Sequence, residues 1–372
     1  MSCKNLISRY YPGFGESQAL SLCKFQITLQ HFLYGVIAYE SHISIASFLI
    51  NLFHFFILTR KTMRSSSVNI IMAAVAIFDI LSLSVQLKVV IIRCITSISC
   101  CSLLNSYGSI LIDMYIYKLK DYSRRCSTWL CFSIALIRIL VIRYPFSRKL
   151  EKLSLPKSSL FVILSVSLGS LPINILNAFE NEIRPQNKQF PCFPNDTTSY
   201  ALVYTDFFTK NNGFLVKIST ASNTTASLII PCVLFPIVTF FLVLEFRKKK
   251  SRSILSSSKE DTNSRTTKLV VYITVFFLIA EFPFGVTQAA MWLYSDALGI
   301  RLFITTVNSF FSMIFAANTM SHFFICMFMS SQYRETVKYL ISCGYLSQKV
   351  RVGVVSTTSN SSQRRISTAK HL

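Results

Sequence analysis

The sequence predicts an all-α membrane protein, a bundle of seven transmembrane helices followed by a short amphipathic helix. Of the 372 residues, 52% are hydrophobic and only 15% are charged, which leaves too little polar surface to cover a soluble globule of this size. Six apolar stretches are long enough to cross a bilayer. Basic residues cluster between these stretches, and their positions indicate how often the chain crosses.

The six clear stretches each approach or exceed the length of about 20 residues that a transmembrane helix needs. They cover residues 34–58, 68–92, 158–179, 220–244, 268–293 and 302–328. Residues 94–142 are ambiguous, because their cleanest apolar run, residues 126–137, is short and follows a series of charged side chains. Hydropathy alone therefore leaves six or seven helices.

The distribution of Lys and Arg decides between these two numbers. These residues concentrate at 60–64, 143–157, 247–268 and 334–370, and short basic loops remain in the cytoplasm. The first two of these loops share a side only if an even number of crossings separates them, so residues 94–142 must cross once. We expect an extracellular segment at 1–33, a seven-helix domain at 34–328, and a cytoplasmic helix with a Ser/Thr-rich tail at 329–372.

The net charge of +22 would suggest nucleic acid as the partner of a soluble protein, but here the basic clusters flank apolar spans. This arrangement predicts contact with membrane lipid and no binding of nucleic acid. The eleven cysteines follow no metal-ligand spacing, and no nucleophile and base have the spacing that catalysis needs. Neither an enzyme nor a metal site is predicted.

Five residues that fall on five separate predicted helices carry a resemblance to the rhodopsin-like G-protein-coupled receptors. They are Asn51, Asp79, Arg138, Pro231 and Pro283. Their spacings match as well, since Asn51 lies ten residues before the basic segment at 61–64 and Arg138 lies seven before Pro145.

Six segments more closely resemble the nematode serpentine receptor class W chemoreceptors, relatives of FMRFamide-type peptide receptors. They are residues 124–130, 135–138, 229–232, 267–270, 280–283 and 329–334. The resemblance covers nearly the whole chain apart from both termini. It implies a plasma-membrane receptor that transduces an extracellular peptide or chemosensory small molecule to heterotrimeric G proteins, with arrestin as a further partner and sensory cilia as one location.

The same resemblance implies which residues meet the G protein. Arg138 stands where the superfamily has the arginine that reaches the G protein on activation, although it could also simply extend to the membrane surface. The usual acidic neighbour is Ile137 here, which implies a weaker resting-state contact and higher basal activity. The other residues expected at this interface are Arg143, Arg247, Lys248, Tyr333 and Arg334.

A polar core is expected around Asp79, because an ionisable group at that depth in a membrane helix needs a partner. The resemblance places Asn51, Ser127, Asn318 and His322 near it. This group binds a sodium ion in many relatives, but His322 replaces the usual asparagine and could take the place of the ion. A sodium site and a hydrogen-bonded carboxyl both remain open, and no other cofactor is expected.

The ligand pocket is expected in the upper bundle. Glu281 stands where relatives carry a tryptophan that moves on activation, and its partner is open: Lys120, His322 or a backbone carbonyl freed by Pro283. Lys120 replaces the carboxylate that anchors amines, which argues against biogenic amines. Because basic residues outnumber acidic ones here, we expect a ligand with an acid or carbonyl group. The expected lining residues are Lys88, Lys120, Asp121, Arg124, Glu281 and Gln288.

Asp121 can also reach Arg124 and Arg125 at i+3 and i+4, so part of this charge can neutralise itself. The resemblance pairs Cys101 with Cys192 in an extracellular disulfide, with Cys100 and Cys94 as rivals for Cys101. Asn195 and Asn223 begin glycosylation sequons on the predicted outer side.

The alternative function is a channel or secondary transporter with seven helices. Transporters tend to have repeated halves, and no internal symmetry is visible in this sequence. Within the receptor interpretation, the ligand could be an environmental chemical or an endogenous neuropeptide.

Overall fold

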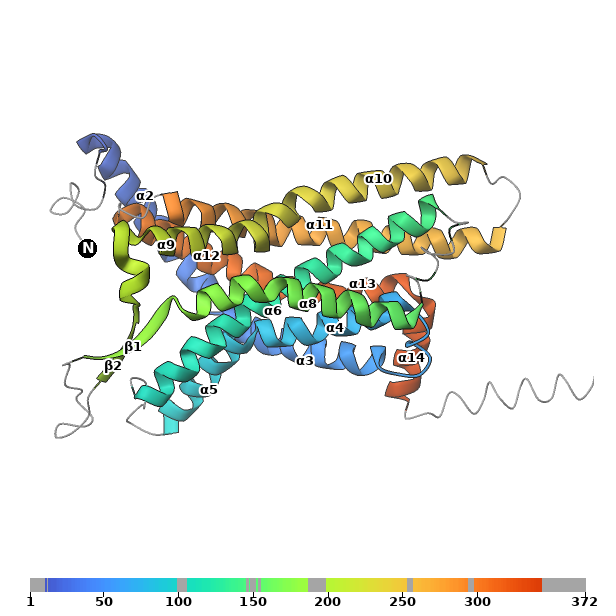
Figure 1. Ribbon diagram of the computed structural model, residues 1–372, viewed down its shortest axis with the longest axis horizontal. Helices are drawn as coiled ribbons and strands as arrows, with labels where there is room; N and C mark the ends of the chain where they lie inside the picture. The colour runs from blue at the N-terminus through green and yellow to red at the C-terminus, as the bar shows by residue number, and fades with distance from the viewer. Residues whose placement is uncertain are drawn as a thin grey trace, which may run out of the picture.

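The computed structural model describes residues 11, 13–98, 106–144, 147, 152, 155–186, 199–252, 257–293 and 298–342. Most of its helices run along the long axis of the molecule (Figure 1). In chain order they are α2 (Glu16–Ile37), α3 (Glu40–Leu58), α4 (Ser67–Ser82), α5 (Ser84–Ile98), α6 (Tyr107–Arg143), α8 (Pro156–Ala178), α9 (Asp206–Thr224), the π-helical turn η2 (Thr225–Ile229), α10 (Ile230–Arg252), α11 (Ser257–Leu293), α12 (Leu298–Thr319), α13 (Ser321–Met329) and α14 (Ser331–Ile341). An antiparallel hairpin of β1 (Asn181–Gln186) and β2 (Ser199–Tyr204), in which Asn181 pairs with Tyr204, lies at one end of the bundle. We call this the hairpin end, and the opposite end the α14 end.

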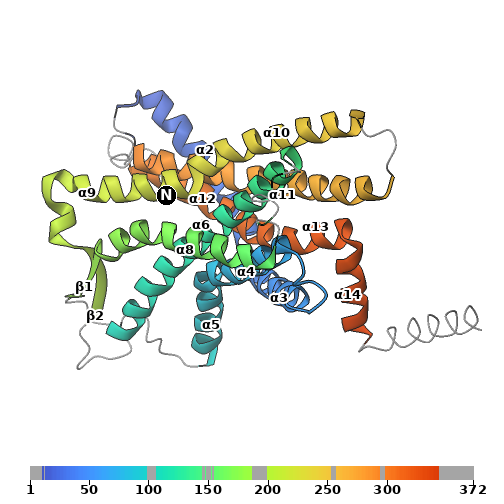
Figure 2. The same cartoon turned by 45° about the vertical axis from the view of Figure 1, so that its right-hand side comes forward.

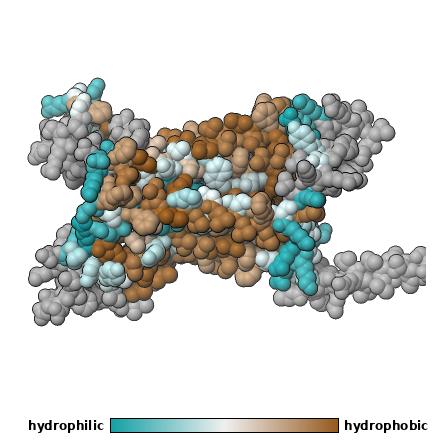
Figure 3. Space-filling model, viewed as in Figure 1, coloured by the Kyte–Doolittle hydropathy of each residue, from teal (hydrophilic) through white to brown (hydrophobic). Residues whose placement is uncertain are grey.

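Seven membrane crossings account for the long helices. Six helical stretches are long and apolar enough to cross a membrane: Glu16–Leu58, Tyr107–Arg143, Pro156–Ala178, Gly213–Glu245, Val271–Ala290 and Gly299–Met329. The seventh crossing is the pair α4 and α5, which meet at a bend of 42°. On the face shown in Figure 3, an apolar band separates two polar ends. The prediction of an all-α bundle with seven membrane helices is confirmed.

The first crossing begins earlier than expected. The apolar pattern predicts a start at residue 34, but α2 begins at Glu16, and only two residues separate it from α3. Helical hydrogen bonds continue across this junction, from Ala38 N to Tyr34 O (3.1 Å) and from Ile43 N to Tyr39 O (3.1 Å). Part of the segment expected to lie outside the bundle is therefore a helical extension of the first span.

The bend in the second crossing has a local cause. The Ser82 hydroxyl donates to the Asp79 carbonyl oxygen at 2.7 Å, and Leu83 N is shared between the carbonyls of Asp79 and Ile80 at 3.3 and 3.2 Å. A serine that bonds back to the preceding turn competes with the helical ladder and bends the helix. The change of direction follows directly after Asp79.

The third crossing, α6, is the one that charge parity predicts. The stretch Tyr107–Arg143 is also long and apolar enough by itself to cross a membrane, so its hydropathy is less ambiguous than expected. It begins at Tyr107, after Ser106, whose side chain accepts a hydrogen bond from Ser109 N at 3.3 Å. Residues 94–98 belong to α5, so helix three is shorter than the ambiguous range. Its arginines Arg124 and Arg125 are buried, because charges that faced lipid would be costly.

The last crossing is interrupted at Met320, between α12 and α13. Met320 N donates to Ala317 O at 3.2 Å and not to Ala316 O, its partner in a regular α-helix. The Ala316 carbonyl can therefore accept hydrogen bonds from side chains. That carbonyl accepts hydrogen bonds from the hydroxyls of Ser47 (2.7 Å) and Thr319 (2.8 Å). Such replacement partners allow a helix to break at membrane depth.

The main hydrophobic core lies toward the α14 end. It gathers apolar side chains of most crossings, among them Ile57, Met72, Leu130, Phe235 and Phe277. The amphipathic helix α14 turns across this end of the bundle (Figures 1 and 2), burying Tyr333, Thr336 and Val337 on one face. This core holds the helices together and leaves most of the buried charge nearer the hairpin end.

Candidate functional site

Arg124 on α6 and Glu281 on α11 form an ion pair between Nη2 and Oε2. Only 7% and 1% of their side-chain surfaces are exposed. The Arg124 guanidinium also lies over the rings of Phe284 and Phe315, at 3.9 and 4.3 Å from their centroids, an arrangement that favours a cation. The partner of Glu281 is therefore Arg124, and not the expected Lys120, His322 or backbone carbonyl.

Arg125, the next residue, bonds to neutral oxygens on other helices. Its Nε donates to Ser227 Oγ (3.0 Å), Nη1 to Ser170 O (2.8 Å) and Nη2 to Asn223 Oδ1 (2.6 Å). These contacts tie α6 to α8, α9 and the π-helical turn η2. Asp121 forms no ion pair with either arginine in the described part of the chain, but its charge still acts on Arg125 from a longer distance.

Asn223 is thus a partner of Arg125 within the fifth crossing. Its amide oxygen accepts from Arg125 Nη2 and from Ser227 Oγ, the latter at 3.2 Å. A glycan would need this amide in the aqueous phase, so its placement within the span Gly213–Glu245 speaks against glycosylation there. Asn195, the other sequon, lies outside the described residues and remains a prediction.

Lys120 lines a cavity of about 410 Å³ near the hairpin end, bounded by α2, α3, α5, α6 and α12. Glu40, Gln86 and Arg93 line the same cavity. Lys120 makes no hydrogen bond or ion pair with any residue that the structure describes, whereas Arg93 Nη1 donates to Ser41 Oγ at 2.8 Å. The negative charges of Asp121 and Glu40 act on this ammonium without forming an ion pair, so its donors can still bind an anion or a carbonyl oxygen.

The other expected pocket residues do not line this cavity. Lys88 forms an ion pair with Asp113 across α5 and α6. Gln288 donates to Asn308 Oδ1 at 3.1 Å, between α11 and α12. Asp121 lines a separate cavity of about 250 Å³ with Lys118 and Glu180. The predicted pocket is therefore divided among several places in the upper bundle.

Glu180, just beyond α8, is a charged residue of the second cavity that the sequence did not single out. Partial burial raises its pKa above the ordinary value, while a hydrogen bond from Ser219 and the charge of Lys118 oppose that rise. Ser219 Oγ donates to Glu180 Oε2 at 3.0 Å. This carboxyl lies between the hairpin and the fifth crossing.

The polar core assembles only in part. Ser127 Oγ donates to Asp79 Oδ1 at 2.5 Å, and His322 Nε2 lies 3.7 Å from Asp79 Oδ2. Asn51 instead donates to Ser47 O (2.9 Å) and Thr319 Oγ1 (3.2 Å), at the break in the last crossing. Asn318 accepts from Ser321 Oγ at 3.3 Å.

The Asp79 carboxylate accepts a hydrogen bond from the Ser127 hydroxyl. Its other oxygen, Oδ2, is buried without a hydrogen-bond partner and lies 3.7 Å from His322 Nε2. No cluster of three or more His, Cys, Asp or Glu side chains in the described ranges could hold a metal ion. The sodium site at Asp79 stays a prediction.

At the α14 end, Arg138 is partly buried and its Nε has no hydrogen-bond partner. No ion pair to Arg138 occurs within the described residues, and its neighbour Ile137 is buried. Arg143 lies 4.0 Å from the Glu245 carboxylate on α10, and Lys248 lies 3.8 Å from it. Arg247 and Lys248 are exposed.

Tyr333 and Arg334 have structural contacts. The buried Tyr333 hydroxyl is hydrogen-bonded to His54 Nδ1 at 2.6 Å. Arg334 Nη1 donates to the carbonyls of Met327 (3.2 Å) and Phe328 (2.9 Å), at the end of α13. Tyr333 is fully buried and so offers no surface to a partner in this conformation.

The predicted disulfide falls on Cys101 and Cys192, which lie outside the described residues, as does the rival Cys100. Cys94, the other rival, is a free and exposed thiol. Cys23 on α2, which the sequence did not single out, is disulfide-bonded.

Comparison with known proteins agrees with this architecture. The family described as serpentine type 7TM GPCR chemoreceptor Srw matches residues 38–344, more than four fifths of the chain, from the first crossing to just beyond α14. No curated protein matches the chain significantly. The chain is a member of the Srw family of serpentine seven-transmembrane GPCR chemoreceptors.

Proposed function

We propose that this receptor activates a heterotrimeric G protein when an extracellular ligand with an acid or carbonyl group binds at Lys120. The observation that carries the proposal is the ammonium of Lys120, which lines a cavity near the hairpin end and forms no ion pair with a described residue. The neighbouring basic residues behave differently, since Lys88 and Arg124 already have carboxylate partners. The hairpin end is the extracellular one in this account, because the basic loops mark the other end as cytoplasmic.

The size of the cavity favours a small molecule over a peptide that enters it whole. At about 410 Å³, it lies in the lower part of the range typical for small-ligand sites, roughly 300–1,000 Å³. Glu40 lines the same cavity and can accept a hydrogen bond from a donor group elsewhere on the ligand. A chemosensory acid that also carries a hydroxyl or amide group fits this lining.

Ligand binding is transmitted toward the cytoplasmic end along α6. Lys120 and Arg124 are four residues apart, so they lie on the same face of the helix, one turn from each other. An anion bound at Lys120 attracts Arg124 and repels Glu281. The ion pair of Arg124 and Glu281 joins α6 to α11 and so stabilises the resting conformation of the receptor. A bound anion weakens this ion pair and shifts the population from the resting to the active conformation.

Arg138 completes the proposed path at the cytoplasmic end. Its guanidinium remains charged and has no carboxylate partner among the described residues, so a G-protein helix can accept its donors. Arg143, Arg247 and Lys248 supply further positive charge at this end. Arrestin, the plasma membrane and sensory cilia belong to the same proposal, by resemblance to related receptors.

A ligand screen with matched variants tests the proposal. The probes are small carboxylic acids, each paired with the alcohol and the amine of the same carbon skeleton, and the readout is nucleotide exchange on a purified G protein. We expect acids to activate the receptor, Lys120→Gln to abolish the response, and Lys118→Gln to preserve it. Lys118 is the control because it lies on the same helix but donates to Ala178 O at 3.0 Å. Activation by amines, or a full acid response in Lys120→Gln, would contradict the proposal.

A further inference from the structure

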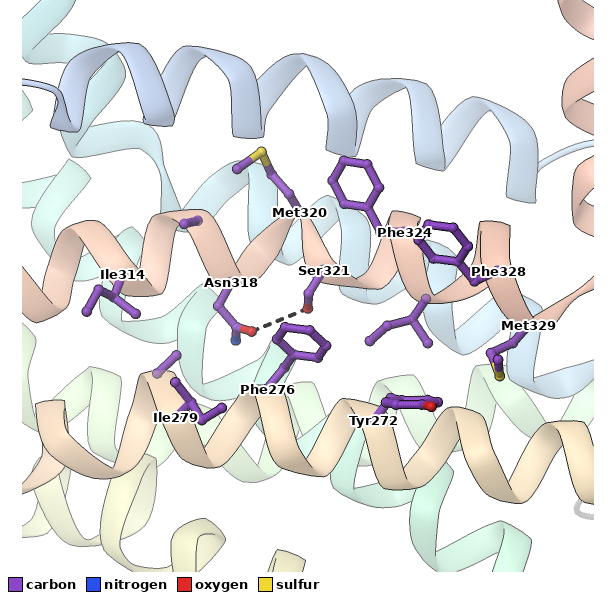
Figure 4. A pocket seen from close by; sticks show the side chains of 13 residues that line it. Tyr272, Phe276, Ile279, Ile314, Asn318, Met320, Ser321, Phe324, Phe328 and Met329 are labelled. Carbon is purple, nitrogen blue, oxygen red and sulfur yellow. Dashed lines mark hydrogen bonds between the residues drawn. The ribbon is translucent and has the colours of Figure 1, made fainter.

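A groove of about 610 Å³ lies between α11 and the paired helices α12 and α13, apart from the cavities near the hairpin end. Figure 4 shows side chains of both walls facing each other across it, with Phe276 and Ile279 on α11 opposite Asn318 and Ser321. The lining is almost entirely aliphatic, aromatic or methionine. None of the residues assigned to ligand binding or G-protein coupling lines it.

The polar side chains Asn318 and Ser321 in the wall are hydrogen-bonded to each other. Ser321 Oγ donates to Asn318 Oδ1 at 3.3 Å, the dashed contact in Figure 4. Asn318 is expected beside Asp79 but lies in this wall instead. A ligand of the groove therefore meets a largely apolar surface, which favours a ligand that is itself largely apolar.

The groove opens sideways to the surface that faces lipid. Its rim residues are strongly exposed, with Phe328 at 74%, Ile279 at 59% and Phe324 at 44%. Most of the lining lies within the crossings Val271–Ala290 and Gly299–Met329, continuous with the hydrocarbon-facing surface of those helices. The lining continues along α13 to Met329, directly before α14. The groove is therefore reached from the leaflet on the α14 side.

The groove also borders the break in the last crossing. Ala317 and Met320, the first and last residues of the turn that interrupts the helix, both line it. On its other side the break is held by Ser47, Thr319 and Asn51. A molecule in the groove packs against the one point of this crossing where the backbone ladder is incomplete.

We propose that one acyl chain of a membrane phospholipid, from the leaflet on the α14 side, occupies this groove and packs against the break at Met320. The largely apolar lining and the sideways opening both suit a flexible hydrocarbon chain. Met320 and Met329 in the lining can adapt to such a chain, because methionine fills irregular apolar gaps. The proposal is independent of ligand class and of G-protein coupling.

Photo-crosslinking tests it with the full-length receptor in nanodiscs of phosphatidylcholine that carries a diazirine in its acyl chain. Mass spectrometry locates the adducts. We expect them to concentrate on residues 272–280 and 317–329, well above the level at Leu164 and Leu168, which are 60% and 62% exposed on α8 without lining this groove. Equal labelling at all lipid-facing positions would overturn the proposal.

A variant that fills the groove provides a second test of the proposal. Ala317→Phe places a ring in the groove and should lower adducts on 272–280 several-fold, whereas Leu164→Phe, a control on the lipid-facing surface, should not. If Ala317→Phe fails to fold, the distribution of adducts on the wild-type receptor still tests the proposal. Loss of the groove adducts on addition of a sterol, but not of unlabelled phosphatidylcholine, would show that the occupant is a sterol and overturn the assignment to an acyl chain.

Discussion

Arg124 and Glu281 pair inside the bundle, between the third and the sixth crossing, with the guanidinium between two aromatic rings. Both side chains are almost fully buried, so each charge depends on the other. Glu281 lies two residues before Pro283, the proline within α11. This pair therefore couples helix three to the proline-containing segment of helix six.

Removing either charge alone should destabilise the receptor more than removing both. Breaking a buried pair leaves an uncompensated charge and typically costs about 3–5 kcal/mol, whereas replacing both partners by apolar residues is often near neutral. We expect Arg124→Met and Glu281→Met each to lower the thermal unfolding temperature of the purified receptor, and the double variant to recover most of the loss. Additive losses would mean that the two side chains act independently.

Glu281→Gln should raise basal signalling. The amide keeps an oxygen that can accept from Arg124 but lacks the negative charge, so the contact between α6 and α11 weakens in the resting state. The measurement is nucleotide exchange without ligand, normalised to receptor number. Glu182→Gln, on the exposed hairpin strand β1, is the matched control and should leave basal exchange unchanged. If basal nucleotide exchange in Glu281→Gln is no faster than in this control, the ion pair of Arg124 and Glu281 does not restrain activation.

The Tyr333 hydroxyl anchors α14 to the first crossing through His54. Tyr333→Phe keeps the ring but leaves a buried imidazole nitrogen unpaired, at a cost of about 1–3 kcal/mol. Amide hydrogen exchange should therefore become faster across α14, with Tyr339→Phe, whose side chain is 47% exposed, as the control. Equal exchange in both variants would show that the hydrogen bond does not hold the helix.

The direction of insertion follows from the basic loops. A tag before Met1 should be accessible to antibody on intact cells, because the amino terminus is expected outside. A tag after Leu372 should become accessible only after permeabilisation. Labelling of both tags on intact cells would contradict an odd number of crossings.

The number of crossings could be predicted because lipid imposes two strong rules, the length of an apolar span and the side of basic loops. For helix three we relied on the second rule, because charges in its upper half interrupt the apolar pattern, although the whole stretch Tyr107–Arg143 is apolar enough to cross. The structure buries two of these charges, Arg124 and Arg125. The early start at Glu16 was missed because polar and charged side chains interrupt residues 16–33.

The partners of the buried charges could not be predicted from spacing. Consecutive residues on a helix point about 100° apart, so Arg124 reaches α11 whereas Arg125 reaches α8, α9 and η2. Several acids and bases lay within sequence reach of each other, and only the packing of helices selects among them. For the same reason Asn51 bonds at the break in the last crossing and not at Asp79.

The measurement that tests the central claim most directly is nucleotide exchange on a purified G protein by Arg138 variants. Arg138 offers several donors and a charge that persists at any physiological pH, and lysine keeps only the charge. We expect Arg138→Ala to abolish basal and ligand-stimulated exchange, Arg138→Lys to be intermediate, and Ile137→Asp to lower basal exchange by adding a carboxylate partner to the resting state. The control is Arg184→Ala on β1, which should signal normally. Normal exchange by Arg138→Ala at a matched receptor level would contradict the proposal that helix three delivers the signal through this arginine.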